Sequence, residues 1–359
     1  MGGLVVFIQV GRAIKRFGST WDRFRPDLDY ARFSGPDDVA AEGGGTKQGR
    51  TFPHVLDGGL KAPGKDFHSA IANSPYGNEL VFELAKACIH AERLGQDDTP
   101  DLLVVSFSSN DLIGHTWGPD SQEALDITLR TDALLGRLLR HLDAKVGEGR
   151  YLLGLTADHG VAPLPEVSRM KGRDAERVSR IAVQERAAKF LQERFKSAKA
   201  NWFESVVFPW FYLNPRMVQA SGQSRERVAA ELAGHLAEQP EIARAFTRFE
   251  PPRDDLHRRM LRSFDPERCG DVGVVLRPLD LPGDRRPGDL LRVETGTTHG
   301  SPYRYDTHVP LMAFGPGIPG GKREEPVTPQ AMAAIFSQAL RVPPPRQAEY
   351  AVPATLFKK

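Results

Sequence analysis

The chain has 359 residues, of which 40% are hydrophobic and 26% are charged. This composition is that of a globular protein, and the length allows one large α/β domain or two ordinary ones. The 48 basic and 46 acidic residues give a net charge of +2, so no charge excess favours nucleic acid or an anionic membrane as a partner. No apolar run approaches the ~18 residues of a membrane span. The first residues also lack the basic start and small-residue cleavage site of a signal peptide.

The first half of the chain predicts a loop-rich layer followed by alternating helices and strands. Residues 17–75 mix aromatic residues, prolines and glycines and predict little regular structure. Apolar residues at helical spacing predict a helix over residues 78–92, and a second, longer helix over residues 121–143 with Ser121 as its cap. Short apolar runs at 102–107 and 151–156 predict buried strands. The order strand, helix, strand predicts a right-handed crossover and a parallel sheet.

The second half changes character. Residues 165–270 are rich in Arg and Glu and predict an inserted helical cap subdomain, interrupted by an aromatic patch between Trp202 and Tyr212. The core is predicted to resume with strands at 272–276 and 309–314, followed by a helix over residues 329–340.

Three short segments carry the residues that predict chemistry. Asp111 and His115 follow the predicted strand 102–107, Asp158 and His159 follow the predicted strand 151–156, and His299 lies in Gly296-Thr-Thr-His299 ahead of another strand. Ligand sites of parallel sheets lie beyond the carboxyl ends of the strands. Carboxylate oxygen and imidazole nitrogen are suitable zinc ligands. One such pair by itself is as compatible with a turn or a helix cap, but three at one sheet edge favour a metal site.

The spacing within the pairs has consequences for metal binding. Asp111 and His115 are four residues apart, so one helical turn brings both to a single ion. Asp158 and His159 are adjacent and converge only at a bend beyond the strand, where they serve the same ion or two neighbouring ions.

These segments resemble the alkaline phosphatase superfamily. They are most similar to its type I phosphodiesterase/nucleotide pyrophosphatase-like branch, which includes bacterial zinc alkaline phosphatases with a threonine nucleophile. The likeness runs from about Trp21 to near the C-terminus. The segments that carry it are Phe52–His54, Ser74–Asn78, Ser106–Pro119, Thr156–Gly160 and Thr298–Tyr303.

The resemblance implies an alkaline-phosphatase-like α/β fold, a three-layer sandwich with a mostly parallel central sheet and a helical cap insertion. It also implies two zinc ions and a small-molecule phosphate ester as substrate. One ion would be held by Asp111, His115 and a third histidine, and the other by Asp158 and His159 together with an early Asp and the nucleophile. His299 is the preferred third ligand because its Thr-His-Gly context matches the family, and His308 is the alternative.

The resemblance also predicts a departure from the family. The early Asp and the nucleophilic Thr or Ser lie well over a hundred residues ahead of the segment that corresponds to Asp111. The run Leu4–Val10 ends in Gln9-Val10-Gly11 rather than in Asp, and Thr20 and Thr51 lack the nucleophile's context. We therefore expect residues 1–359 to form one alkaline-phosphatase-like domain without its N-terminal part, and no residue is assigned as catalytic.

Two functions remain open at this point. The first is metal-dependent phosphate-ester hydrolysis, with monoesters favoured over diesters, in a chain whose own activity is severely reduced or absent. The alternative is a non-catalytic zinc-binding remnant. Members of the family are usually periplasmic or secreted, but the sequence assigns no compartment.

Overall fold

The computed structural model describes residues 11–197, 201–283 and 295–357. The chain divides into two compact units: the first comprises Met1–Val161 and His308–Lys359, and the second comprises Ala162–Thr307. The run Leu4–Val10 lies outside the described residues. The second unit is thus continuous in sequence and interrupts the first.

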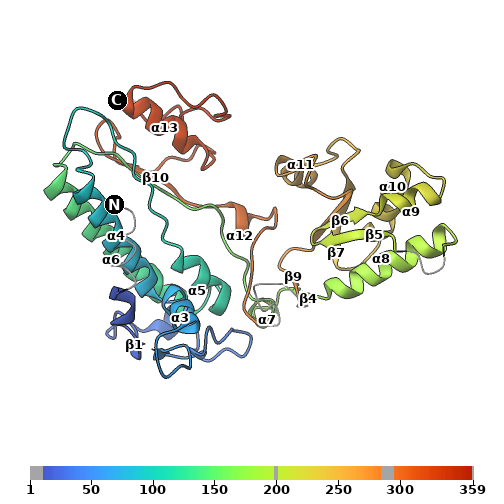
Figure 1. The fold of residues 1–359 in the computed structure, drawn as a ribbon, viewed down its shortest axis with the longest axis horizontal. Coiled ribbons are helices and arrows are strands. Elements are labelled where there is room, and N and C mark those ends of the chain that lie inside the picture. Colours follow the sequence, from blue (N-terminus) through green and yellow to red (C-terminus); the bar gives the residue numbers. More distant parts are fainter. Residues whose placement is uncertain (1–10, 198–200, 284–294, 358–359) are drawn as a thin grey trace. The chain divides into compact units, whose positions relative to one another are not determined.

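Helices α4 and α6 are the largest elements of the first unit, and they pack against each other (Figure 1). Helix α5 contacts both of them. The elements of this unit are β1 (Ser19–Trp21), α2 (Tyr30–Ser34), β2 (His54–Leu56), α3 (Lys65–Ala72), α4 (Pro75–Ala91), α5 (Ser109–Trp117), α6 (Gln122–Lys145), β3 (Leu153–Thr156), β10 (Leu311–Phe314) and α13 (Ala331–Leu340).

The sequence predicts α4 and α6 well because both begin with strong local signals. The side chain of Ser74 accepts a hydrogen bond from the backbone N–H of Tyr76, and Pro75 occupies the first turn of α4. Ser121 caps α6 in the same way by accepting from the N–H of Ala124. The helices predicted over residues 78–92 and 121–143 are confirmed to within three residues at each end.

A buried carboxylate on α6 joins this helix to the loop-rich segment at the start of the chain. Asp126 has no solvent exposure. Its Oδ2 accepts from Trp21 Nε1 at 2.7 Å and from Arg130 Nε at 2.6 Å. Its Oδ1 accepts from the backbone N–H of Phe24 at 2.6 Å and from the hydroxyl of Tyr30 at 2.7 Å. Hydrogen bonds from four donors offset the free-energy cost of removing one carboxylate from water. They therefore hold residues 19–34 on α6, although this segment contains only short helices and strands.

The strand pairs correct the predicted sheet. Strand β3 pairs with β10 in antiparallel fashion, and the run at 102–107 has no regular secondary structure and no strand partner among the described residues. Strands β3 and β10 flank the second unit in sequence, so these two paired strands are far apart in the chain. The prediction of a mostly parallel central sheet is therefore wrong for the strands that the structure describes, in which only the short pair β4–β9 is parallel.

The second unit contains a four-stranded antiparallel sheet in the order β5-β6-β8-β7. Helix α10 packs against this sheet and against α8. The elements of this unit are α7 (Pro165–Met170), β4 (Arg177–Val178), α8 (Arg180–Arg194), β5 (Phe203–Val207), β6 (Trp210–Leu213), α9 (Pro215–Ala220), α10 (Arg225–Ala237), β7 (Ile242–Thr247), α11 (Asp255–Arg262), β8 (Val272–Leu276), β9 (Leu281–Pro282) and α12 (Arg304–Thr307).

Two sequence-based predictions for this region need correction. The segment 165–270 is not only helical, because its aromatic patch forms the hairpin β5–β6, whose inward residues Phe203, Phe211 and Leu213 are buried. The strand predicted at 272–276 is confirmed, but it is the fully buried strand β8 of this sheet and does not return to the first unit. That the second unit acts as a cap stays a prediction.

Within the described residues, no helix combines the length and the apolar character needed to cross a membrane.

We expect replacement of Asp126 by asparagine to lower the free energy of unfolding by about 2–4 kcal/mol. An amide nitrogen would face two of the four donors, and their buried N–H or O–H groups would lose their acceptor. Denaturant unfolding followed by circular dichroism measures the change. Asp132→Asn is the matched control on the same helix, because Asp132 is exposed. An equal loss in both variants would contradict the role of the buried carboxylate.

Candidate metal centre

Helix α5 carries the first ligand pair, and its N-terminus is held by buried polar contacts. The side-chain oxygen of Asn78 accepts from the backbone N–H of Ser109 at 3.1 Å, and the Ser109 hydroxyl donates to the carbonyl of Ala72 at 2.8 Å. The side-chain amide of Asn78 also donates to Asn110 Oδ1 at 2.8 Å. A Cβ atom at Gly77 would lie 2.3 Å from the Ser109 hydroxyl, so the close approach of α4 to α5 requires glycine there.

The C-terminus of α5 is held by an aromatic cluster. Trp117 is fully buried, and its ring meets that of Trp21 edge to face with centroids 5.6 Å apart. The ring of His54 lies 5.0 Å from that of Trp117 and 4.8 Å from that of Trp21. Helix α5 ends at Trp117, and the residue that caps it, Gly118, has a φ of 90° that favours glycine. Both ends of this nine-residue helix are therefore set by packing rather than by helix propensity.

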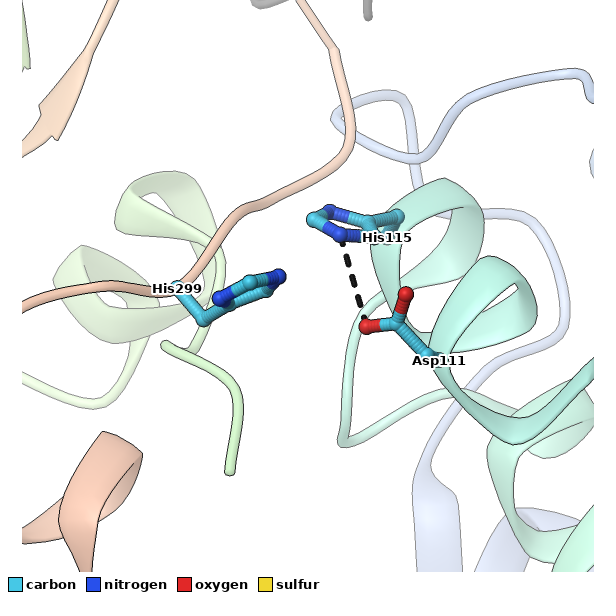
Figure 2. A group of neighbouring side chains, drawn as sticks. All are labelled: Asp111, His115 and His299. Carbon is cyan, nitrogen blue, oxygen red and sulfur yellow. Dashed lines mark ion pairs between the residues drawn. The ribbon is translucent and has the colours of Figure 1, made fainter. Parts of the chain in front are cut away.

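Asp111 and His115 lie on one face of α5, as their spacing predicts. Figure 2 shows the two side chains directed toward each other, with the ion pair between Asp111 Oδ1 and His115 Nε2 at 3.4 Å. Each residue offers one ligand atom suitable for a metal ion. Two donors about 2.1 Å from a tetrahedral zinc ion lie about 3.4 Å apart, so this carboxylate and this imidazole fit the same ion.

The second pair, Asp158 and His159, lies at the end of β3 and approaches the first. His159 Nε2 lies 3.9 Å from Asp111 Oδ1 and 3.7 Å from Asp158 Oδ2. The other ring nitrogen, Nδ1, is 2.9 Å from the carbonyl oxygen of Gly160. A carbonyl accepts only from a protonated Nδ1, which leaves Nε2 with the lone pair that a metal ion needs. Asp111 thus lies between two imidazole nitrogens, and the side chain of Asp158 is largely exposed.

The two candidates for the third histidine belong to different units. His308 begins the second segment of the first unit and is exposed. His299, which Figure 2 also labels, belongs to the second unit. Its segment is attached at Ala162: the N–H of Ala162 donates to the carbonyl of Thr298 at 3.2 Å, and the Thr297 hydroxyl donates to the carbonyl of Ala162 at 2.6 Å.

Two buried glutamates, Glu42 and Glu123, lie near the C-terminal end of α5. His54 Nε2 lies 2.9 Å from Glu123 Oε1, and neither side chain is exposed to solvent. Burial and the nearby Glu123 raise the pKa of Glu42 to about 9. Burial also raises the pKa of Glu123, although its contact with His54 opposes the shift. Among the described residues, Oε2 of each glutamate has no hydrogen-bond partner, which favours the protonated form.

Sequence reasoning did not identify the residues that hold α5 in place. The sequence places Asn78 only in the matching segment Ser74–Asn78, and it gives Glu123 no role at the site. The position of Asn78 in Ser74-Pro-Tyr-Gly-Asn78 could have indicated a structural role. A polar side chain in the first turns of an otherwise apolar helix needs a hydrogen-bond partner. The sequence contained no signal for the pairing of Glu123 with His54, which are 69 residues apart.

An α/β scaffold that brings two Asp-His pairs together defines a class of protein, those with a metal centre built from carboxylate and imidazole ligands. The family model described as type I phosphodiesterase / nucleotide pyrophosphatase matches residues 42–302. The chain belongs to this family, and thereby to the alkaline phosphatase superfamily that its motifs resemble.

Named relatives agree with this assignment. The chain is 27% identical over 330 residues to alkaline phosphatase PafA of Elizabethkingia meningoseptica, which covers 90% of this chain and 57% of that protein. It is 30% identical over 284 residues to alkaline phosphatase PhoD of Zymomonas mobilis, which covers 75% of this chain and 47% of that protein. The chain thus spans only about half the length of these relatives.

A solved structure supports the fold. The crystal structure of wild-type alkaline phosphatase PafA superposes with a TM-score of 0.84 at 26% identity, and the match covers 99% of this chain and 66% of that one. The predicted alkaline-phosphatase-like α/β fold is therefore confirmed, apart from the strand directions corrected above.

We expect Glu42→Gln to become more stabilising as the pH rises. The folded state keeps the Glu42 proton up to a pKa of about 9, against an ordinary value of 4.5, so its stabilisation is complete below pH 4.5 and is lost as the pH rises toward 9. Glutamine cannot ionise and avoids this loss. Between pH 5 and pH 8 the unfolding free energy of the variant should gain roughly 1–3 kcal/mol relative to wild type.

Denaturant titrations at several pH values measure this difference, with the exposed Glu92 replaced by glutamine as the control. If the difference for Glu42→Gln stayed constant between pH 5 and pH 8, Glu42 would be ionised throughout and the assigned pKa would be wrong.

Proposed function

We propose that this protein is a metal-dependent phosphate-ester hydrolase that prefers monoesters. The observation that carries the proposal is the approach of two imidazole nitrogens to one carboxylate oxygen, in His115, His159 and Asp111. The relatives described above are named as alkaline phosphatases, which supports the choice of monoesters. The segment Ser106–Asp111, which resembles the phosphatase branch, supports it as well.

The proposed ligands divide into two sets. Asp111 and His115 would hold one divalent ion and Asp158 and His159 a second, with zinc preferred for this combination of oxygen and nitrogen donors. Bound divalent ions lower the pKa of an attacking oxygen and neutralise charge on the phosphate. The hydrogen bond from His159 Nδ1 to Gly160 sets the tautomer and the orientation of one ligand.

His299 is the proposed third ligand of the first ion. Its segment is hydrogen-bonded to Ala162, which is covalently joined to Val161. The Thr-His-Gly context of His299, within the matching segment Thr298–Tyr303, supports this choice.

Asp306 is the proposed positioning residue for His299. Its side chain is buried, and its Oδ2 accepts from the backbone N–H of Ser301 at 2.7 Å. This bond closes the turn that follows His299 within the second unit, which favours a defined position for the imidazole.

Zinc affinity tests the ligand assignment. We expect His115→Ala and His299→Ala to weaken zinc binding by about 100-fold or more, because each removes one donor from the same ion. His308→Ala should leave it within about threefold, and the exposed His90→Ala serves as control. Isothermal titration with zinc in a weak competing chelator measures all four variants. A large loss with His308→Ala and none with His299→Ala would reverse the choice of the third ligand.

The attacking group is not assigned to a residue of this sequence. This observation favours a second candidate function, a zinc-binding protein without hydrolytic activity. It also implies that the polypeptide of residues 1–359 should hydrolyse p-nitrophenyl phosphate at least about 10³-fold more slowly than PafA, since loss of a nucleophile removes several orders of magnitude in kcat.

The assay compares p-nitrophenyl phosphate with bis-p-nitrophenyl phosphate in the presence of zinc, and His115→Ala provides the background rate. Residual turnover above this background, faster on the monoester, supports hydrolysis. Zinc binding without turnover above background favours the second candidate. A rate equal to that of PafA would show that the attacking group lies within these residues, and a failure to bind zinc would overturn both functions.

A further inference from the structure

Strands β4 and β9 form a short parallel pair in the second unit, and polar contacts extend this pair to the turn that precedes β9. The N–H of Leu281 donates to the carbonyl of Glu176 at 3.0 Å, and the N–H of Glu176 donates to Oδ1 of Asp280 at 2.8 Å. Asp280 is buried, so its carboxylate depends on such donors in place of water. These contacts join residues 176–178 to residues 277–282, and the two stretches together are named the β4–β9 platform.

Arg177 of this platform binds the chain on the N-terminal side of His299. Its Nε and Nη2 donate to the two carboxylate oxygens of Glu166 at 2.8 and 3.0 Å, and Nη2 also donates to the carbonyl of Gly296 at 2.9 Å. The Arg177 side chain is only 13% exposed. A planar guanidinium that is held at two nitrogens by one carboxylate has little rotational freedom. It therefore holds the backbone shortly before the proposed ligand.

The platform and the adjoining end of β8 also bind the chain on the C-terminal side of His299. The hydroxyl of Tyr305 accepts from the backbone N–H of Leu279 at 3.1 Å. The hydroxyl of Tyr303 donates to the carbonyl of Leu276, the last residue of β8, at 2.7 Å. The segment of residues 296–306 is thus attached to neighbouring parts of the second unit on both sides of the histidine.

The platform residue that contacts Tyr305 has a strained backbone. Leu279 has a φ of 73°, in the left-handed region that a residue with a branched side chain rarely adopts. Such a conformation persists only where the surrounding contacts impose it, and it is found most often at functional sites. The hydrogen bond to Tyr305 is one contact that favours it, and the segment on the other side of this bond carries His299.

We propose that Arg177 and Tyr305 are positioning residues that fix the two ends of the segment 296–306, so that His299 loses little conformational freedom when it binds zinc. The inference rests on the proposed role of His299 as a ligand and adds the residues that act through it. A ligand held in place before the ion arrives binds it more tightly, because less entropy is lost on binding. Residues that orient a metal ligand typically change metal affinity by about 10–100-fold.

Zinc titration of the full chain against a weak competing chelator tests both residues. Tyr305→Phe removes the acceptor of the Leu279 N–H and keeps the ring. Arg177→Lys keeps the positive charge, but a single ammonium group cannot reproduce the planar contact with Glu166 and Gly296. We expect each variant to weaken zinc binding by about tenfold or more. In the chain without zinc, amide exchange of residues 296–306 should be faster in both variants than in wild type.

The second unit offers a matched control for each variant. Arg194 donates to both carboxylate oxygens of Glu231 at 3.0 and 2.7 Å, and the hydroxyl of Tyr212 donates to the carbonyl of Arg268 at 2.8 Å. Arg194→Lys and Tyr212→Phe therefore remove the same kinds of contact elsewhere in the unit, and zinc affinity should stay within about threefold. Circular dichroism verifies the fold of all four variants, and Tyr305→Phe, which lacks only one hydroxyl, tests the proposal even if Arg177→Lys unfolds.

The same two replacements in a His299→Ala background separate positioning from general stability. Without the imidazole there is nothing left to position, so neither replacement should weaken zinc binding further by more than about threefold. If both cause the same loss in this background as in wild type, they act through the fold and the proposal is wrong.

Two further results have different meanings. Wild-type zinc affinity in Arg177→Lys and Tyr305→Phe, together with a large loss in His299→Ala, would overturn the positioning role and leave His299 as a ligand. Unchanged affinity in His299→Ala would overturn the ligand assignment itself, and the positioning role with it.

Discussion

The position of helix α5 is the constraint on which the candidate metal centre depends. This helix has only nine residues, too few to be stable on its own in water, so tertiary contacts must hold it. Asn78 and Ser109 hold one end, and the cluster of Trp21, His54 and Trp117 holds the other. Because Asp111 and His115 point from the same face of a helix held at both ends, their ligand atoms stay at a separation suited to one ion.

Two carboxyl groups in the same region, those of Asp126 and Glu42, are buried in different ways. Asp126 is fully buried and accepts four hydrogen bonds. Glu42 lies near a second buried acid, and its raised pKa shows that the structure favours its neutral form instead. The hydrogen bonds of Asp126 and the contact of His54 with Glu123 join the loop-rich segment of residues 17–75 to α6, in place of the regular elements that this segment largely lacks.

The exposed apolar surface of the first unit contrasts with the closed core of the second. In the second unit the strand β8 is buried along its whole length, and helices and neighbouring strands cover it. In the first unit Leu102 and Val104 remain exposed beside an unpaired backbone. An apolar segment of this kind is stable in water only when a partner covers it or when charged residues protect its edge.

Local signals in the sequence determined helices α4 and α6 and the family of this protein, and they predict its candidate ligand residues. Serine caps and apolar periodicity predict α4 and α6, and the Asp-His motifs predict which side chains meet, because capping and i,i+4 spacing act within a few residues. Tertiary structure alone decided how the strands pair, since the apolar runs at 102–107 and 272–276 look alike in sequence, but among the described residues only the second has strand partners. It likewise decided that Asn78 and Glu123 support α5. Strand partners and buried polar contacts join residues far apart in the chain, and such pairing depends on the complete packing rather than on local propensity.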